Sequence, residues 1–260
     1  MSALPHRLKR SVLINAERST VFGFFTDSAL FASWWGAGST IEPRPGGRVV
    51  IRYPNSVVAL GTVEALVPDQ SIVFTYGYEK PDGAQLRGHG IAPGASRVSI
   101  TLRDSEDGTV VDLEHEFETP AQRDMHDPGW RFQLSLFANV AAKHQHAAAP
   151  ARMDTWFAAW NESRSQERLG ILRALAEPTL RFRDGFAAIA GIEELSAHIG
   201  ATHMHMPGIS LRRAGEPREC QGMLLVDWIA ARPDGKEAAR GTNYVSLSPR
   251  GRVREVIGFR

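Results

Sequence analysis

The stretch Ala-Ala-Ala-Pro-Ala at residues 147–151 most constrains how this chain folds, because it separates two segments that each carry a full pattern of helices and strands. The chain has 260 residues, which is long for one compact domain and sufficient for two domains with separate hydrophobic cores. The sequence therefore predicts a first domain at residues 1–146, a linker at 147–151 and a second domain at 152–260.

The composition argues against a nucleic acid or membrane partner. Thirty basic and twenty-nine acidic residues give a formal net charge of +1, and no basic block could follow a phosphate backbone. No segment approaches the roughly 20 apolar residues of a membrane-spanning helix, and residues 1–17 lack the apolar run of a signal peptide. Cys220 is the only cysteine, which excludes an internal disulfide and a cysteine-cluster metal site. We expect a cytoplasmic protein that handles small molecules.

The first segment predicts a strand, two short helices, a strand meander and a long helix. Ser19 or Thr20 is expected to cap the first helix. The long helix is expected to begin after Pro128, because an apolar stripe follows with a spacing of three to four residues: Trp130, Leu134, Phe137 and Ala141. Alternating apolar and polar residues in the last two strands predict one buried face. The predicted strands are 8–14, 48–53, 57–66, 71–78, 97–103 and 109–117, and the second helix is 28–35.

Two short motifs accompany this order of elements, Trp34-Trp35-Gly36 after the second helix and Gly129-Trp130 at the start of the long helix. With them, residues 6–146 resemble the helix-grip fold of the START and birch-pollen-allergen superfamily, in the branch named after the activator of heat-shock protein ATPase. The resemblance implies an antiparallel sheet wrapped on a long C-terminal helix, with a pocket between them. It implies no catalytic residue set, and the implied pocket residues are Trp35, Tyr76, His89, Trp130 and Phe137.

Each implied pocket residue has an ordinary structural alternative. Trp34 and Trp35 are adjacent, so at least one of the two indoles would pack in the core or at the pocket rim. His89 lies between two glycines, where a solvated turn residue is the usual interpretation.

The second segment predicts three helices followed mainly by strands. The first helix carries an apolar stripe of Met153, Trp156, Phe157 and Trp160, and the second, at 165–175, is expected to be capped by Ser165. A third helix follows Gly191 and carries His198 on its apolar stripe. The predicted strands are 180–184, 209–213, 220–232, 236–247 and 253–259, and together they predict a curved antiparallel sheet on three helices.

Three motifs mark this segment: Trp156 to Asn161, Arg181 to Asp184, and Gly251 to Phe259. With them, residues 151–260 resemble the cone-shaped α+β barrel of the nuclear transport factor 2-like superfamily, in the SnoaL-like group that includes polyketide cyclases and ketosteroid isomerases. The resemblance implies that Asp184 is a general base that abstracts a proton beside a carbonyl. It places Trp156 and Asn243 where isomerase relatives carry oxyanion donors. Asn243 retains a donor amide, so it is the second candidate catalytic residue.

The predicted cup of the second domain is lined by aromatic rings and a histidine, namely Trp156, Trp160, His198 and Trp228. Asp184 has an alternative role, since an aspartate before Gly185 commonly accepts hydrogen bonds from its own turn. His203 and His205 would face one way on an extended segment, but two ligands are too few for a metal. We therefore expect no metal and no cofactor.

Both predicted domains are α+β folds with a hydrophobic cup, which favours a protein that binds a small apolar or polycyclic ligand. One alternative is an isomerase or polyketide-cyclase-type enzyme that uses Asp184 as its base. A second alternative is a chaperone-associated interaction protein, implied only by the resemblance of the first domain. Cone folds pair through their open sheet, so a homodimer through the second domain is the assembly that the resemblance implies.

Overall fold

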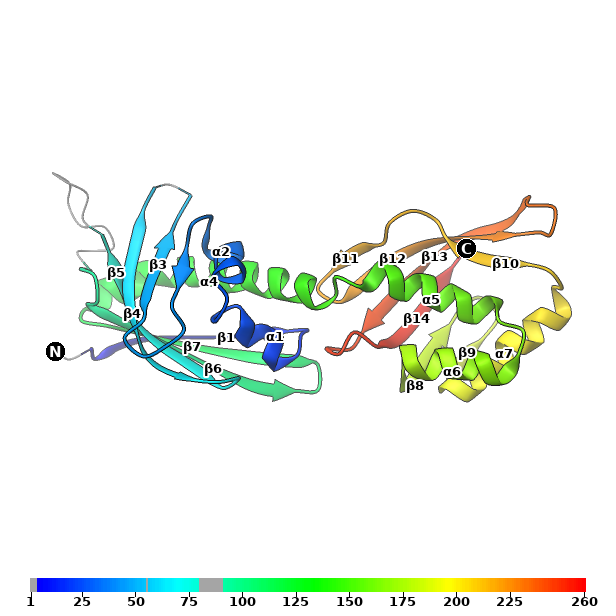
Figure 1. Cartoon of the computed structure of the whole chain (residues 1–260), viewed down its shortest axis with the longest axis horizontal. Helices are drawn as coiled ribbons and strands as arrows, with labels where there is room; N and C mark the ends of the chain where they lie inside the picture. Colours follow the sequence, from blue (N-terminus) through cyan, green and yellow to red (C-terminus); the bar gives the residue numbers. More distant parts are fainter. Residues whose placement is uncertain (1–3, 55, 80–90) are drawn as a thin grey trace. The chain divides into compact units, whose positions relative to one another are not determined.

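The computed structural model describes residues 4–54, 56–79 and 91–260 of the chain. It divides into two compact units, Met1–Ala142 and Lys143–Arg260, which we call unit 1 and unit 2 (Figure 1). Each unit has its own cluster of buried hydrophobic residues, as the expectation of two cores requires. The predicted site residue His89 lies outside the described residues.

Unit 1 is built on a seven-stranded sheet in the order β1-β7-β6-β5-β4-β3-β2. Neighbouring strands pair in antiparallel fashion throughout, as the predicted meander requires. The strands are β1 (His6–Ile14), β2 (Thr40–Ile41), β3 (Arg48–Arg52), β4 (Val58–Val67), β5 (Ser71–Tyr78), β6 (Ser96–Ser105) and β7 (Gly108–Phe117).

The hairpin of β6 and β7 shows why one face of this sheet is buried. Ile100 pairs with Leu113 and Leu102 with Val111, and all four side chains are buried while the residues between them are more exposed. Alternation along a strand sends successive side chains to opposite faces. The predicted buried face is therefore confirmed.

Three helices accompany this sheet among the described residues: α1 (Arg18–Gly23), α2 (Ser28–Trp35) and α4 (Pro120–Gln145). Helix α2 has the predicted bounds, and Asp27 caps it by accepting hydrogen bonds from the backbone N–H groups of Ala29 and Leu30 at 2.7 and 3.0 Å. The predicted cap of α1 by Ser19 or Thr20 is wrong. Its N-cap is Glu17, which makes no side-chain capping bond.

Helix α4 begins at Pro120, earlier than the predicted start after Pro128, which lies inside the helix. The start is set by a capping box, since Thr119 Oγ1 accepts from the Gln122 N–H and Gln122 Oε1 accepts from the Thr119 N–H. Proline at the first helical position fits this start because its missing N–H would have no helical partner. The predicted apolar stripe is confirmed, as its members are buried: Trp130, Leu134, Phe137 and Ala141.

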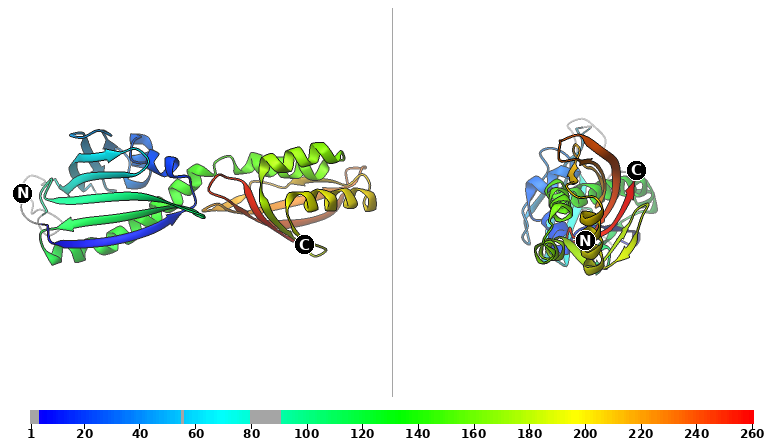
Figure 2. Two further views of the ribbon diagram at one scale, coloured as in Figure 1. Left: turned by 90° about the horizontal axis from the view of Figure 1, so that it is seen from below. Right: turned by 90° about the vertical axis from the view of Figure 1, so that its right-hand side faces the viewer.

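Unit 2 places helices α5 (Ala149–Asn161), α6 (Ser165–Leu175) and α7 (Ile192–His205) against a curved sheet (Figure 2). The strand order is β10-β12-β13-β14-β8-β9, with β11 paired to β12. The pair of β14 and β8 is parallel, and the other pairs are antiparallel. The strands are β8 (Ala176–Arg183), β9 (Ala188–Ala190), β10 (Ser210–Arg213), β11 (Arg218–Cys220), β12 (Met223–Ala231), β13 (Glu237–Leu247) and β14 (Val253–Phe259).

Both units are thus mixed α+β structures with mainly antiparallel sheets, which confirms the predicted fold class. Within the described residues the sheet of unit 2 stays open between β10 and β9, so it is a curved sheet rather than a closed barrel.

Several local predictions for unit 2 differ from the structure. The single strand predicted at 220–232 is divided, since β11 ends at Cys220 and β12 begins at Met223. The N-cap of α6 is Arg164 rather than Ser165, and no side chain caps it. His203 and His205 lie in the last turn of α7 rather than on an extended segment, so they do not alternate along a strand. Residues 149–151 of the predicted linker form the first turn of α5.

In the part of the chain that the structure describes, no helix is both long and apolar enough to cross a membrane.

Candidate functional site

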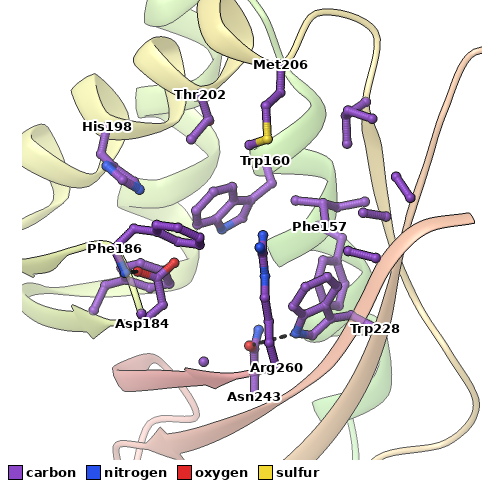
Figure 3. Close-up of a pocket in the computed structure, with 18 of the residues that line it drawn as sticks. Phe157, Trp160, Asp184, Phe186, His198, Thr202, Met206, Trp228, Asn243 and Arg260 are labelled. Atoms are coloured by element: carbon purple, nitrogen blue, oxygen red, sulfur yellow. Dashed lines mark hydrogen bonds between the residues drawn. The ribbon is translucent and has the colours of Figure 1, made fainter.

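Unit 2 contains a cavity of about 830 Å³ between the sheet and helices α5 and α7 (Figure 3). Aromatic and aliphatic side chains supply most of its wall. The structure brings all six residues predicted for the second domain into this wall: Trp156, Trp160, Asp184, His198, Trp228 and Asn243.

An aromatic group forms the helical side of the cavity. Trp156 and Trp160 are four residues apart on α5, so both indoles lie on the same helix face, with ring centroids 6.4 Å apart. Phe182 on β8 lies 5.4 Å from the Trp160 ring and 6.1 Å from the imidazole of His198 on α7. The indole N–H of Trp160 is buried and has no hydrogen-bond partner among the described residues.

Asp184 directly follows β8 and uses one carboxylate oxygen to build a turn. Its Oδ1 accepts hydrogen bonds from the backbone N–H groups of Phe186 and Ala187, both at 2.8 Å. Its Oδ2 has no hydrogen-bond partner in the described part of the chain. Asp184 therefore has the turn role that the sequence analysis gave as its alternative. This role uses only one carboxylate oxygen and leaves the other for a ligand.

Asn243 is oriented by Trp228 on the neighbouring strand β12. The indole Nε1–H donates to Asn243 Oδ1 at 3.0 Å (Figure 3). Because an indole nitrogen only donates, this bond fixes which end of the amide carries the oxygen. The amide NH₂ of Asn243 is then the end that can donate to a ligand in the cavity.

Gly258 on β14 lies between the two candidate catalytic residues. A Cβ atom at this position would stand 3.2 Å from Asp184 Cβ and 3.3 Å from Asn243 Oδ1. The absence of a side chain here lets the carboxyl and the amide approach the same region of the cavity wall. Asn243 also pairs directly with Gly258 in the strand register.

The histidines of α7 have separate surroundings. The ring of His198 is half-buried against Trp160 and Phe182. His203 Nε2 lies 2.7 Å from the backbone oxygen of Trp160, and since a carbonyl only accepts, this nitrogen carries the proton. Among the described residues, no group of three or more His, Cys, Asp or Glu side chains could hold a metal ion.

Phe186 and Arg260 are among the residues of the cavity wall that the sequence interpretation missed. Phe186 is 74% exposed in the turn after Asp184, and Arg260 follows β14. The Arg260 Cζ atom lies 4.8 Å from the centroid of the Phe186 ring and 5.9 Å from that of Trp228. A large aromatic residue directly after an Asp-Gly turn was the sequence signal for Phe186.

Four of the residues predicted to line a pocket in the first domain are described by the structure, and they lie in the core of unit 1. Trp35 packs edge-on against Trp130 with ring centroids 5.5 Å apart, and Phe137 stacks on Trp34 at 4.5 Å. Tyr76 shares a hydrogen bond of 2.8 Å with the hydroxyl of Tyr53. All four predicted residues are buried, which matches the core-packing alternative considered for the indoles: Trp35, Tyr76, Trp130 and Phe137.

A buried polar group accompanies these rings. His115 on β7 accepts a hydrogen bond at Nδ1 from the indole of Trp130 at 2.9 Å, so its Nε2 carries the proton and donates to Ser96 Oγ at 2.8 Å. Burial, together with the nearby charge of His126, holds the pKa of His115 well below its usual value of 6.5. His115 is therefore neutral in the folded unit at neutral pH.

Comparison with known proteins supports the two-part interpretation. Residues 15–142 match the family described as activator of Hsp90 ATPase homolog 1-like protein. A SnoaL-like family protein from Agrobacterium tumefaciens is 30% identical, and the match covers 45% of this chain and 97% of that protein, with a TM-score of 0.41. The chain belongs to the SnoaL-like family. This membership rests on the identity over nearly the whole relative, and we assign it to unit 2 because the activator-like match occupies unit 1.

Other solved structures are similar to about half of this chain. The AHSA1-like protein from Rhizobium etli is 28% identical over 54% of this chain and 86% of its own, with a TM-score of 0.41. The Aha1 dimer from Colwellia psychrerythraea is 17% identical over 50% of this chain and 91% of its own, also with a TM-score of 0.41. The search of curated proteins gave no significant match. The SnoaL-like unit thus contains the cavity, and the activator-like unit contains the buried aromatic core.

Proposed function

We propose that unit 2 binds a small apolar or polycyclic molecule in its cavity. The observation that carries this proposal is a space of about 830 Å³ with mostly apolar walls and a few convergent polar groups. Ligand pockets typically measure about 300–1,000 Å³ and combine these two features. The polar groups are the Oδ2 atom of Asp184 and the amide NH₂ of Asn243, which flank Gly258.

The same geometry favours acid–base chemistry as a second function. Asp184 Oδ2 would take a proton from a carbon beside a carbonyl, and the Asn243 NH₂ would donate to the enolate oxygen that forms. Return of that proton to another carbon completes an isomerisation without a co-reactant. The name of the Agrobacterium relative also proposes an isomerase activity for that protein.

A fluorescence titration with N-phenyl-1-naphthylamine tests the binding proposal on the full chain. This neutral apolar probe should bind the wild type, and Ala201→Trp should weaken binding because Ala201 lines the cavity on α7. Ala197→Trp is the matched control, since Ala197 is exposed on the same helix and does not line the cavity. Equal binding by all three proteins would refute the proposal.

We also propose that two copies of the chain pair through the outer face of the unit 2 sheet. Leu225, Tyr244 and Ile257 are direct cross-strand neighbours on β12, β13 and β14, and none of them is buried. The residues beside them in sequence, Val226, Val245 and Val256, are buried on the opposite face. An apolar row on an open sheet suits a second copy of the same surface. The cytoplasmic location stays a prediction from the sequence.

A further inference from the structure

The guanidinium of Arg260 lies against two aromatic rings of the cavity wall (Figure 3). The rings come from separate segments, since Phe186 belongs to the turn after β8 and Trp228 to β12. A guanidinium beside ring faces is attracted by their π electrons, while its N–H groups stay available for hydrogen bonds. The two rings therefore hold a cation at the cavity without using its donors.

Arg260 makes no ion pair and no side-chain hydrogen bond with the described residues. Arg213 in the same unit illustrates the contrast, because it pairs with both Asp154 and Glu216. Asp184 is the acidic residue of the cavity wall, and it forms no ion pair with Arg260. The guanidinium is thus free to bind an anion that enters the cavity.

The strand order places the backbone of Arg260 close to the proposed reaction centre. Gly258 lies between Asp184 and Asn243, and Arg260 follows it by two residues in a nearly extended chain. Positions two apart in a strand share a face and are separated by about 7 Å.

We propose that the ligand of unit 2 is an apolar ring system that carries an anionic group, such as a carboxylate or sulfonate, bound by Arg260. The anionic group lies at the Arg260 end of the cavity, and the opposite end of the ring system faces Asp184 and Asn243. This inference rests on the proposed function, since it names the class of ligand for the same cavity.

Two fluorescent probes with the same ring skeleton test this inference on the full chain at low salt. N-phenyl-1-naphthylamine is neutral, and 1-anilinonaphthalene-8-sulfonate differs from it by one sulfonate. The wild type should bind the sulfonate probe about tenfold more tightly, as expected for a charge-assisted hydrogen bond at a partly exposed site. Arg260→Gln should remove that preference, so that the two probes bind with nearly equal affinity.

Arg181→Gln is the matched control for the loss of one positive charge. Arg181 is exposed on β8, where the adjacent residue Phe182 faces the cavity, so this variant should keep the preference for the sulfonate. Equal affinity of the wild type for the two probes, or an unchanged preference in Arg260→Gln, would overturn the role of Arg260 while the cavity remained a binding site. Failure of both probes to bind, or binding that Ala201→Trp does not weaken, would instead overturn the proposed function.

Discussion

Among single residues, Asp184 is the most important for the proposed chemistry, because its two carboxylate oxygens have different roles. Oδ1 holds the turn through the N–H groups of Phe186 and Ala187, and Oδ2 is left for a ligand. Asp184→Asn should therefore keep the turn, because an amide oxygen accepts the same two bonds, while it removes the base. We expect proton exchange beside the carbonyl of 2-tetralone to fall by about 10²–10⁴-fold, measured by NMR in D₂O.

Asp184→Ala is the control for that experiment, since it removes the turn acceptor as well as the base. It should lower both the exchange rate and the thermal stability, whereas Asp184→Asn should lower only the rate. Exchange in the wild type no faster than in buffer, or equal exchange by Asp184→Asn, would count against acid–base chemistry at this residue.

Trp228 provides a second test at this scale, because its indole fixes the orientation of the Asn243 amide. Trp228→Phe keeps an aromatic ring in the wall, while it removes the indole N–H donor and part of the ring volume. We expect a loss of about 1 kcal/mol of stability and a several-fold lower exchange rate, as the amide is then free to turn over. Denaturant unfolding and the same exchange assay would measure both effects, and an unchanged rate would argue against Asn243 as the donor.

Only some residues of the cavity wall could be predicted from the sequence. The aromatic spacing of Trp156 and Trp160 on one helix, and the position of Asp184 after a strand, were visible in the chain. The contribution of Arg260 was not, because it depends on a pairing register that places it beside Phe186 and Trp228, which lie far from it in sequence.

Among the helices and strands, α4 was predicted to begin about eight residues later than it does. The helix was predicted to begin after Pro128 because its apolar stripe starts there, yet Pro128 lies inside the helix. The real signal was Thr119-Pro120 followed by Gln122, a capping box with proline at the first position. By contrast, α2 and α6 were predicted with their observed bounds, because their ends coincide with clear breaks in the apolar pattern.

The capping box can be tested by Thr119→Ala. Loss of the Oγ1 acceptor should reduce the stability of unit 1 by about 1 kcal/mol, measured by denaturant unfolding. Thr119→Ser keeps the hydroxyl and should remain near the wild type. If the two variants were equally stable, the box would not determine where α4 begins.

The buried hydrogen bonds between β7 and α4 predict a pH dependence for unit 1. The pKa of His115 is lowered by burial and by His126 of α4, and Tyr76 of β5 also faces it. As the pH falls below about 6.5, His115 is protonated in the unfolded chain but stays neutral in the folded unit. The free energy of unfolding of unit 1 therefore decreases with falling pH, by up to about 1.4 kcal/mol per pH unit. Unfolding titrations between about pH 7 and 5.5 would measure that slope.

His115→Gln supplies the comparison for this slope. It keeps polar atoms at the buried position and removes the titrating ring, so it should be less stable at pH 7 but show a smaller decrease on acidification. An equal slope in both proteins would assign the pH dependence to other groups.

At the scale of the whole molecule, the open sheet of unit 2 predicts association of two chains. Leu225→Glu places a charge in the proposed interface and should shift the protein from dimer to monomer in sizing with light scattering. Phe132→Glu is the control, because Phe132 is an exposed apolar residue on α4 of unit 1. A monomeric wild type, or a dimer that survives Leu225→Glu, would contradict the proposed interface.

Two domains were predicted because each half of the chain carries a full pattern of helices and strands, and the structure has two compact units with separate hydrophobic clusters. In unit 1 the predicted residues Trp35, Trp130 and Phe137 are buried and pack against other aromatic rings of the core. In unit 2 the wall residues leave a cavity, because small residues such as Gly258 and Ala201 stand among the aromatic ones.

The cavity of unit 2 is proposed as a binding site for a small apolar molecule. Native mass spectrometry of the wild type and Ala201→Trp, each purified from the natural host and then incubated with N-phenyl-1-naphthylamine, tests it most directly. We predict one bound small molecule per chain for the wild type, either co-purified or the added probe, and none for Ala201→Trp. A wild type that stays empty with the probe, or equal occupancy of the two proteins, would contradict the claim.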